Sequence, residues 1–206
     1  MKKLLLTSFF YFLIFGCNNE NQESTNIESK SVIVDSINSN QDSIRVLDLI
    51  RKVMIWQDSK DRIEPLPLKG NDSNICIGVD YEIQKENTNK LQVSNYFTKN
   101  FIQNYEKIIN RIDEIIRNGE VEPFDIAEMA PFNFSTDASP WCNCQDNLDW
   151  NKIEFKEFKL NQNTCEFKWH WKDWKGHSYW VKATKENNVW RTDKMEGFDY
   201  NIATKI

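Results

Sequence analysis

The sequence predicts an α+β protein in which N-terminal helices pack on a strongly bent antiparallel sheet of about four strands. Apolar residues recur at helical spacing in the first half of the predicted domain, and they alternate with polar residues in the second half. Seven of the eight tryptophans lie between residues 141 and 190, within the alternating region. Large aromatic side chains fit a pleated surface well, so this region predicts a stiff aromatic sheet.

The N-terminus has the pattern of an export signal. Residues 1–3 are basic (MKK), and Leu4 to Phe15 is a mostly apolar run that is too short to span a bilayer, which takes about 20 residues. The run ends in Ile14-Phe15-Gly16-Cys17, which resembles the lipobox of bacterial lipoproteins. The resemblance implies a signal peptide over residues 1–16, a mature N-terminus at a diacylated, palmitate-bearing Cys17, and a cell-envelope location. Asn18 in place of Asp favours the outer membrane. The alternative is an ordinary cleaved signal peptide in which Cys17 occurs by chance.

Residues 17–42 are predicted to be a flexible tether from the lipidated cysteine. The segment is rich in Asn, Ser, Glu, Gln and Asp and has no aromatic residue, so it cannot bury enough apolar surface to offset its ordering entropy. Its one apolar island, Ser31 to Ile37, is expected to dock onto the domain. Residues 43–206 then form a single domain, which is a normal size for one hydrophobic core.

Two helices and one ambiguous segment are predicted before the sheet. Apolar residues at Val46, Ile50, Val53 and Trp56 predict a helix over 44–57, and the Pro- and Gly-containing stretch 58–74 predicts a loop. Residues 75–83 alternate as a strand would, but a short helix over 81–93 competes, and we favour the helix. A full apolar stripe predicts a helix over 95–117, which ends at Asn118-Gly119.

The remaining chain predicts a long loop followed by the sheet. Residues 120–149 contain three prolines and no periodicity, and a loop of this length is usually functional or pinned. Strands follow over 152–160, 164–173, 177–185 and 188–195. A change of apolar parity in the first strand predicts a bulge. The hairpin turns are expected at Lys175-Gly176 and Asn187-Asn188.

The segment from Val181 to Phe198, which ends in a polar turn, Trp190, Thr192 and Met195, resembles the last two strands of the nuclear transport factor 2-like superfamily. The start of the predicted third helix, Tyr96 to Ile102, is similar to that of secreted bacterial members of unknown function. The resemblance covers roughly residues 80–198 and implies a cone-like fold. Thr192 departs from the pattern, which has a hydrophobic residue there. The superfamily includes isomerases, dehydratases and non-catalytic binding domains, so the fold does not select a function.

Four cysteines remain after Cys17, and an even number in an exported protein predicts disulfides. The candidates are Cys76, Cys142, Cys144 and Cys165. We expect at least one bond that involves Cys142 or Cys144 and ties the long loop to the sheet or to Cys76. Free thiols are one alternative. The other is a redox or metal site at Cys142-Asn143-Cys144 with His170 or His177, although zinc sites usually space paired cysteines by two to four residues.

The remaining chemistry is sparse. His170 shares a strand face with two lysines and is expected to be solvated, and His177 is expected at a turn. Acidic side chains in the long loop are expected to be ordinary surface acids, although they are also candidates for a cluster: Asp125, Glu128, Asp137 and Asp146. No Gly-rich phosphate loop, metalloprotease helix, serine-nucleophile motif or internal repeat occurs, so we predict no catalytic residue, metal or cofactor.

The predicted function is therefore a lipid-anchored, non-enzymatic binding or interaction domain for an unknown protein or small ligand. Removing Lys2 and Lys3 changes the net charge from −5 to −7 (24 basic against 31 acidic residues), which argues against a nucleic-acid partner. Binding candidates are Trp169, Trp171 and Trp180, against the alternative that all are core. Other functions remain open: a small-molecule enzyme using a carboxylate or His in a cone pocket, and an immunity protein against an envelope toxin.

Overall fold

A computed structural model describes residues 25–134, 138–145 and 149–206 of the chain. The chain divides into two compact units, residues 1–38 and 39–206. The predicted signal peptide and Cys17 lie outside the described residues. The second unit is the mixed helix-and-sheet domain that the sequence predicts, with a four-stranded antiparallel sheet.

The first helix is longer than the sequence predicts. Helix α1 runs over Thr25–Gln57, so residues 25–42 of the predicted tether are helical instead of irregular. Adding a residue to an existing helix gains one hydrogen bond without a new nucleation cost, which lets the helix over 44–57 extend into polar sequence. Residues 17–24 of the tether lie outside the described part. The expected docking of residues 31–37 concerns side chains that the structure does not describe.

Asp42, which the sequence assigned to the tether, fixes α1 to the sheet. Its carboxylate accepts hydrogen bonds from Lys185 Nζ at 2.9 Å and from Trp190 Nε1 at 3.0 Å. Burial alone would raise the pKa of this carboxyl, but the two hydrogen bonds and the charges of Lys185 and Arg45 hold it below its usual value. The domain therefore starts a few residues before position 43.

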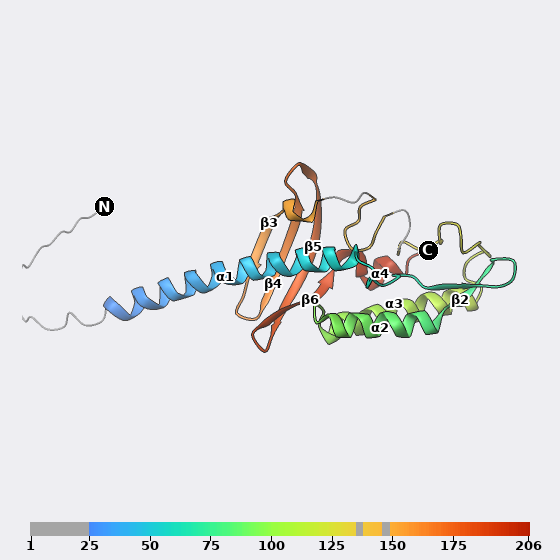
Figure 1. The fold of residues 1–206 in the computed structure, drawn as a ribbon, viewed down its shortest axis with the longest axis horizontal. Helices are drawn as coiled ribbons and strands as arrows, with labels where there is room; N and C mark the ends of the chain where they lie inside the picture. Colours follow the sequence, from blue (N-terminus) through green and yellow to red (C-terminus); the bar gives the residue numbers. More distant parts are fainter. Residues whose placement is uncertain (1–24, 135–137, 146–148) are drawn as a thin grey trace, which may run out of the picture. The chain divides into compact units, whose positions relative to one another are not determined.

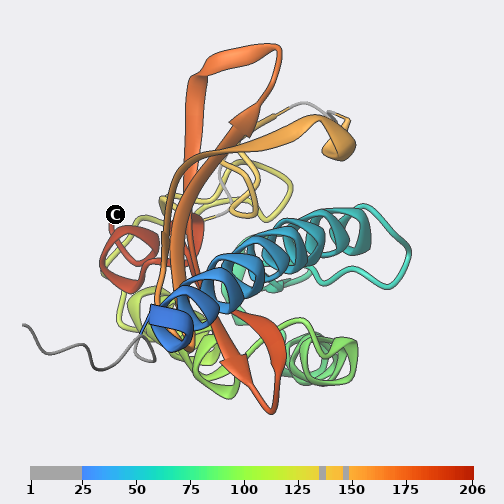
Figure 2. The ribbon, with the colours of Figure 1, turned by 90° about the vertical axis from the view of Figure 1, so that its left-hand side faces the viewer.

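The C-terminal part of α1 lies along the four-stranded sheet (Figures 1 and 2). Val46, Ile50 and Val53 are fully buried, as their spacing predicts. The Arg51 guanidinium donates to the carbonyl of Ile153 at 3.2 Å, and Trp150 donates its indole N–H to Asp58 just beyond the helix end. Apolar contact and polar contact both hold this stretch of α1 against the start of the sheet.

The ambiguous segment contains both a strand and a helix. Strand β2 (Cys76–Val79) ends where the Asp80 side chain accepts from the backbone N–H groups of Glu82 and Ile83 and starts α2 (Tyr81–Ser94). The favoured helix is confirmed. The stretch 58–74, predicted to be a loop, contains strand β1 (Leu68–Gly70), which pairs antiparallel with β2. Three residues with a glycine are too few to show an alternation.

Helix α3 (Lys99–Arg117) begins later than the predicted position 95. Asn95 adopts a left-handed conformation (φ 60°) that ends α2, and the Thr98 hydroxyl accepts from the Phe101 N–H at 3.1 Å to start α3. Between them, Phe97 forms a parallel bridge with Thr192 of the sheet. The apolar stripe of α3 is buried as predicted: Phe101, Tyr105, Ile108, Ile112 and Ile115.

The large sheet is a meander in the order β3-β4-β5-β6. Its strands are β3 (Ile153–Leu160), β4 (Thr164–Trp171), β5 (Trp174–Glu186) and β6 (Val189–Met195). The bulge predicted in the first strand is confirmed, between Phe155 and Glu157. The turn at Asn187-Asn188 is confirmed as well, and both residues have positive φ, as a tight two-residue hairpin requires.

The β4–β5 turn is not where the sequence predicts it. Trp171 and Trp174 pair with each other, so the turn consists of Lys172 and Asp173, and the predicted turn residues 175 and 176 belong to β5. The glycine of Lys175-Gly176 misled the assignment, since a glycine is also tolerated inside a strand. This longer hairpin projects from the domain at the top of Figure 2.

The last strand explains the irregular apolar spacing of the C-terminal segment. Trp190 and Thr192 are buried, the register then shifts, and Met195 is buried on the same inward face. The shift occurs where Lys194 pairs with Lys182 while Thr192 pairs with Ala183. Thr192 thus takes an inward position despite its hydroxyl. Short helical turns complete the domain: η1 (Trp150–Lys152), η2 (Glu196–Phe198) and α4 (Tyr200–Ala203).

Candidate functional site

The three candidate tryptophans lie on different faces of the sheet. Trp169 and Trp171 of β4 are buried, with 0% and 3% of their surfaces exposed, and they belong to the central core. Trp180 of β5 points to the opposite face and is half-buried. Only Trp180 among the three lines one of the pockets of the described domain, so the other two serve as scaffold.

The Trp180 pocket, as we call it, has a volume of about 600 Å³. It forms where the end of β6 meets α3 and the C-terminal turns. Helix α3 contributes amide side chains, the sheet contributes Trp180 and Lys194, and η2 with α4 contributes the remaining wall. Its lining residues are Asn100, Asn104, Trp180, Lys194, Met195, Glu196, Phe198, Asp199, Tyr200, Asn201 and Ile202.

Trp180 differs from the seven other tryptophans in what its ring contacts. Six of the others stack or tilt against aromatic rings, and Trp190 lies under the Lys185 ammonium and donates its N–H to Asp42. Within the described part of the chain, the Trp180 indole has no ring contact, cation contact or side-chain hydrogen bond. The part of the Trp180 ring that lines the pocket is therefore not covered by another described aromatic ring.

Glu196 fixes the wall of the Trp180 pocket. One carboxylate oxygen accepts from the backbone N–H of Trp180 at 2.8 Å, and the other accepts from the Asn143 amide at 3.3 Å. These two hydrogen bonds let the Glu196 carboxylate hold the strand and the neighbouring turn in place.

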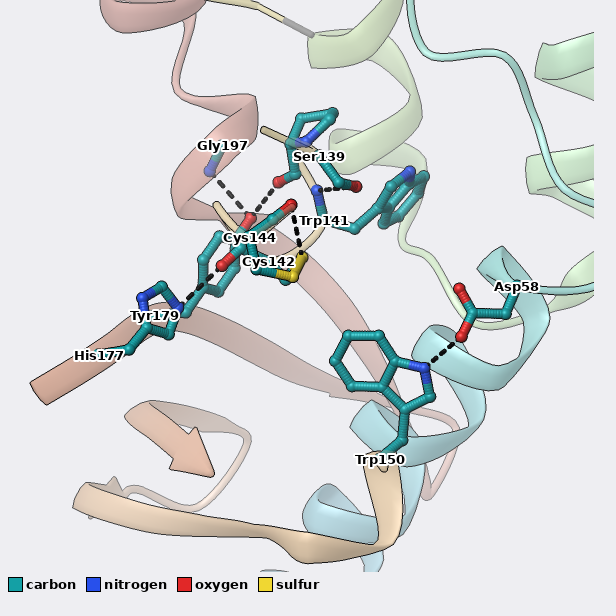
Figure 3. Close-up of a disulfide and its surroundings, with 10 residues drawn as sticks. Asp58, Ser139, Trp141, Cys142, Cys144, Trp150, His177, Tyr179 and Gly197 are labelled. Carbon is teal, nitrogen blue, oxygen red and sulfur yellow. Dashed lines mark hydrogen bonds between the residues drawn. A yellow bond between two sulfur atoms is a disulfide. The ribbon is translucent and has the colours of Figure 1, made fainter. Parts of the chain in front are cut away.

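Tyr179, the residue before Trp180, locks the same wall from the core side (Figure 3). Its buried hydroxyl donates to the Pro140 carbonyl at 2.6 Å and accepts from the Gly197 N–H at 2.9 Å. Burial raises the pKa of this phenol well above its usual value, so it stays protonated. Gly197 is required here, because a Cβ at this position would lie 2.7 Å from the Pro140 carbonyl carbon and even closer to its oxygen.

The disulfide joins Cys142 to Cys144 (Figure 3). The expectation that a bond would tie the long loop to the sheet or to Cys76 is therefore wrong, since Cys76 and Cys165 are free and buried. The loop is held to the sheet by hydrogen bonds instead. Asn143 has a positive φ of 50°, which allows the tight turn that brings the two sulfurs together. Burial raises the pKa of the Cys165 thiol to about 12 and also raises that of Cys76, so both are inert.

Neither histidine lies at the Trp180 pocket. His177, expected at a turn, lies within β5, where its Nε2 is 2.9 Å from the Cys142 carbonyl and its ring stacks on Trp174. His170, expected to be solvated, is half-buried, and its Nδ1 is enclosed without a hydrogen bond to any described atom. The metal alternative also loses its two sulfur ligands, because the disulfide consumes both thiols.

A second pocket of about 730 Å³ lies between the end of α1, α2 and the turn 138–145. Its wall carries charges of both signs, including Lys60, Arg62 and Glu64. Desolvation by neighbouring groups, followed by the negative charge of Asp80, raises the pKa of Glu64. Glu64 is the one carboxylate among the described residues with a raised pKa, although its side chain is exposed to solvent.

The acidic residues of the long loop do not form a site in the described part of the chain. The Asp125 carboxylate accepts from the Ala127 N–H at 2.8 Å and shapes a turn, and Glu128 is exposed. Asp137 and Asp146 lie outside the described residues. The described residues contain no group of three His, Cys, Asp or Glu placed to hold a metal ion.

Comparisons with known proteins leave the chain unassigned: no family model, curated protein or solved structure matches it. Among the helices that the structure describes, none is long and apolar enough to cross a membrane.

Proposed function

We propose that this chain is a lipid-anchored envelope protein whose domain binds a ligand without transforming it, and that the Trp180 pocket is the binding site. The observation that carries the proposal is the Trp180 indole. It is half-buried at a pocket of about 600 Å³, and among the described residues no aromatic ring stacks on it and no group pairs with its N–H. Rigid aromatic surface contributes binding energy at low entropic cost.

The polar groups of the Trp180 pocket support binding over catalysis. Glu196 accepts from Trp180 and Asn143 with its two oxygens, and Asp199 accepts from the first N–H groups of α4 with one oxygen, Oδ1. No histidine or cysteine is among the lining residues. The lining therefore offers no imidazole base or thiol nucleophile for a substrate.

The Trp180 pocket is tested by binding of small molecules without any assumption about their class. Saturation-transfer NMR with a chemically diverse fragment library should give compounds whose signals disappear in Trp180→Ala. The matched control is Trp174→Ala, which removes an exposed tryptophan from the same strand and should keep these signals. Compounds that bind equally well to the Trp180→Ala protein would contradict the proposal.

The anchor and the cone-like fold belong to the same proposal. The apolar segment that ends at Gly16-Cys17 supports lipidation, and the helices followed by a bulged four-stranded meander support an NTF2-like arrangement. A Cys17→Ser variant should move the protein from the detergent phase to the aqueous phase on phase separation. Unchanged partition would refute the lipid anchor and, with it, the outer-membrane location.

The second pocket supports an alternative function as a small-molecule enzyme. Glu64, whose pKa is raised, is the group there that fits a general acid. In that case Glu64→Gln would abolish turnover, while Trp180→Ala would leave turnover intact. Turnover that is unchanged in Glu64→Gln, together with ligand binding that depends on Trp180, would exclude this alternative.

A further inference from the structure

We propose that the ligand of the Trp180 pocket is an uncharged saccharide. This inference rests on the proposed binding function and adds the chemical class of the ligand. A saccharide ring has an apolar C–H face and an equatorial rim of hydroxyls, each of which both donates and accepts hydrogen bonds. The Trp180 pocket offers surfaces that match both features.

The apolar part of the Trp180 pocket is one ring and a closed floor. Trp180 presents its unoccupied indole, and Met195 and Phe198, with 1% and 2% of their surfaces exposed, form the base beside it. Phe198 is itself held by Trp141, with ring centroids 4.6 Å apart, so the floor is rigid. The C–H face of a sugar ring packs on such an aromatic surface without needing a charged group.

The polar part consists of amides that are only partly used. Asn104 donates to the Phe198 carbonyl at 2.7 Å and Asn100 donates to Asp193 at 3.2 Å, which leaves their side-chain carbonyl oxygens available as acceptors. The Asn201 side chain makes no hydrogen bond to a described residue and is exposed. An amide offers a donor and an acceptor together, which is the complement of a hydroxyl.

The charges of the Trp180 pocket argue against a charged ligand. The lining residues include one cation, Lys194, and two carboxylates, Glu196 and Asp199, and the Lys107 ammonium lies 4.2 Å from the centroid of the lining Tyr200 ring. These four charges balance, so neither an anion nor a cation meets a net opposite charge. Lys182 lies opposite Lys194 in the sheet, and Glu166 lies opposite Lys182 on its other side, which balances that charge as well.

A fully apolar ligand fits no better. It would remove the free acceptor oxygens of Asn100 and Asn104 and the Asn201 amide from water without returning a hydrogen bond, which is unfavourable. The volume of about 600 Å³ lies within the range of ordinary small-molecule sites, roughly 300–1,000 Å³. A short oligosaccharide of two or three rings is consistent with this size.

The test is a glycan array probed with the soluble form of the mature chain, followed by calorimetry on the best neutral oligosaccharide. The array carries neutral glycans together with uronic-acid and sulfated counterparts of the same backbones. We expect neutral glycans to bind, with an affinity that changes less than twofold between low and high salt, because no ion pair is involved. Trp180→Ala should weaken binding at least tenfold, and Asn201→Ala should weaken it several-fold.

Trp174→Ala is again the matched control and should bind as well as the parent protein. Asn201 is exposed and its side chain makes no described contact, so loss of binding in Asn201→Ala cannot be attributed to unfolding. Preference for the charged glycans, with steep salt dependence, would overturn the inference. The inference would also be overturned if the protein bound no glycan but did bind small-molecule fragments in a way that depends on Trp180. In that case the proposed binding function would survive. No ligand of any class at Trp180 would overturn both.

Discussion

Gly197→Ala should destabilise the domain because the turn 138–145 leaves no room for a side chain at that position. The added Cβ would lie 2.7 Å from the Pro140 carbonyl carbon and 2.8 Å from its Cα, and it would lie closest to the carbonyl oxygen. These are backbone atoms, so no rotamer change relieves the clash. Moving Pro140 away also breaks the hydrogen bond from the Tyr179 hydroxyl at 2.6 Å.

The expected magnitude follows from these two terms. Overpacking of a closed site costs about 1–3 kcal/mol, and loss of one buried hydrogen bond costs about 1 kcal/mol. The sum, about 3 kcal/mol, corresponds to a fall in melting temperature of roughly 6–12 °C for a domain of this size. Differential scanning calorimetry and urea denaturation of the Gly197→Ala protein measure it directly.

Gly176→Ala is the matched control. A Cβ at Gly176 would meet only the Trp174 ring, at 3.7 Å, which is an ordinary contact, so the free energy of unfolding should change by less than about 0.5 kcal/mol. If Gly197→Ala melts as the control does, then Pro140 does not pack on Gly197. The hydrogen bonds that hold the wall of the Trp180 pocket would then be wrong as well.

Further predictions concern stability and cysteine chemistry. Asp42→Asn should lower the free energy of unfolding at pH 7 by about 2–4 kcal/mol in chemical denaturation. The folded pKa of Asp42 lies below its ordinary value of 3.8, so this stabilisation is present above pH 3.8 and is lost as the pH falls through the folded pKa. A difference in unfolding free energy between parent and variant that did not shrink as the pH was lowered below 3.8 would contradict it. Replacing Cys142 and Cys144 by Ser should cost only about 1.6 kcal/mol, because the closed loop has three residues, and the larger loss expected for a long loop would indicate another pairing. Trp169→Ala should cost about 3–5 kcal/mol by calorimetry, as expected for a core tryptophan, and a near-parental melting temperature would move Trp169 back to the candidate binding residues.

The sequence predicts most of the domain because apolar spacing reports directly which face of an element is buried. Val46, Ile50 and Val53 recur at helical spacing and are fully buried in α1. Cys165 and Phe167 alternate with polar residues and are buried in β4. These elements are long enough for the period to be counted.

The remaining features depend on contacts between distant segments, which no local pattern reveals. Strand β1 is three residues long, and its partner β2 is needed to define it. The extension of α1 to Thr25 runs through a mostly polar sequence whose few apolar residues show no helical period. The β4–β5 turn is set by the pairing of Trp171 with Trp174, and that pairing outweighs the local preference of Gly176 for a turn.

The Trp180 pocket could be anticipated only in part. Trp180 was a candidate because of its residue type, and its outward position follows from the buried parity of Tyr179 and Val181 on the same strand. The other walls come from α3 and α4, whose nearest lining residues, Asn104 and Tyr200, are 96 positions apart in the sequence. The sequence did not predict a bond between Cys142 and Cys144, because no local pattern indicates the left-handed conformation of Asn143 between them.

The tryptophans show how the sheet separates scaffold from binding surface. Trp141, Trp169 and Trp171 are buried with indole N–H groups that reach no described acceptor, so their large ring area in the core outweighs the cost of an unpaired donor, about 1–3 kcal/mol each. Residues selected for bulk in this way tolerate few substitutions. Trp180 has the opposite arrangement: its ring packs on no described ring, and its backbone is fixed by Glu196. The part of the Trp180 ring that lines the pocket is therefore the surface that the proposed ligand would contact, whereas the rings of Trp169 and Trp171 are closed off in the core.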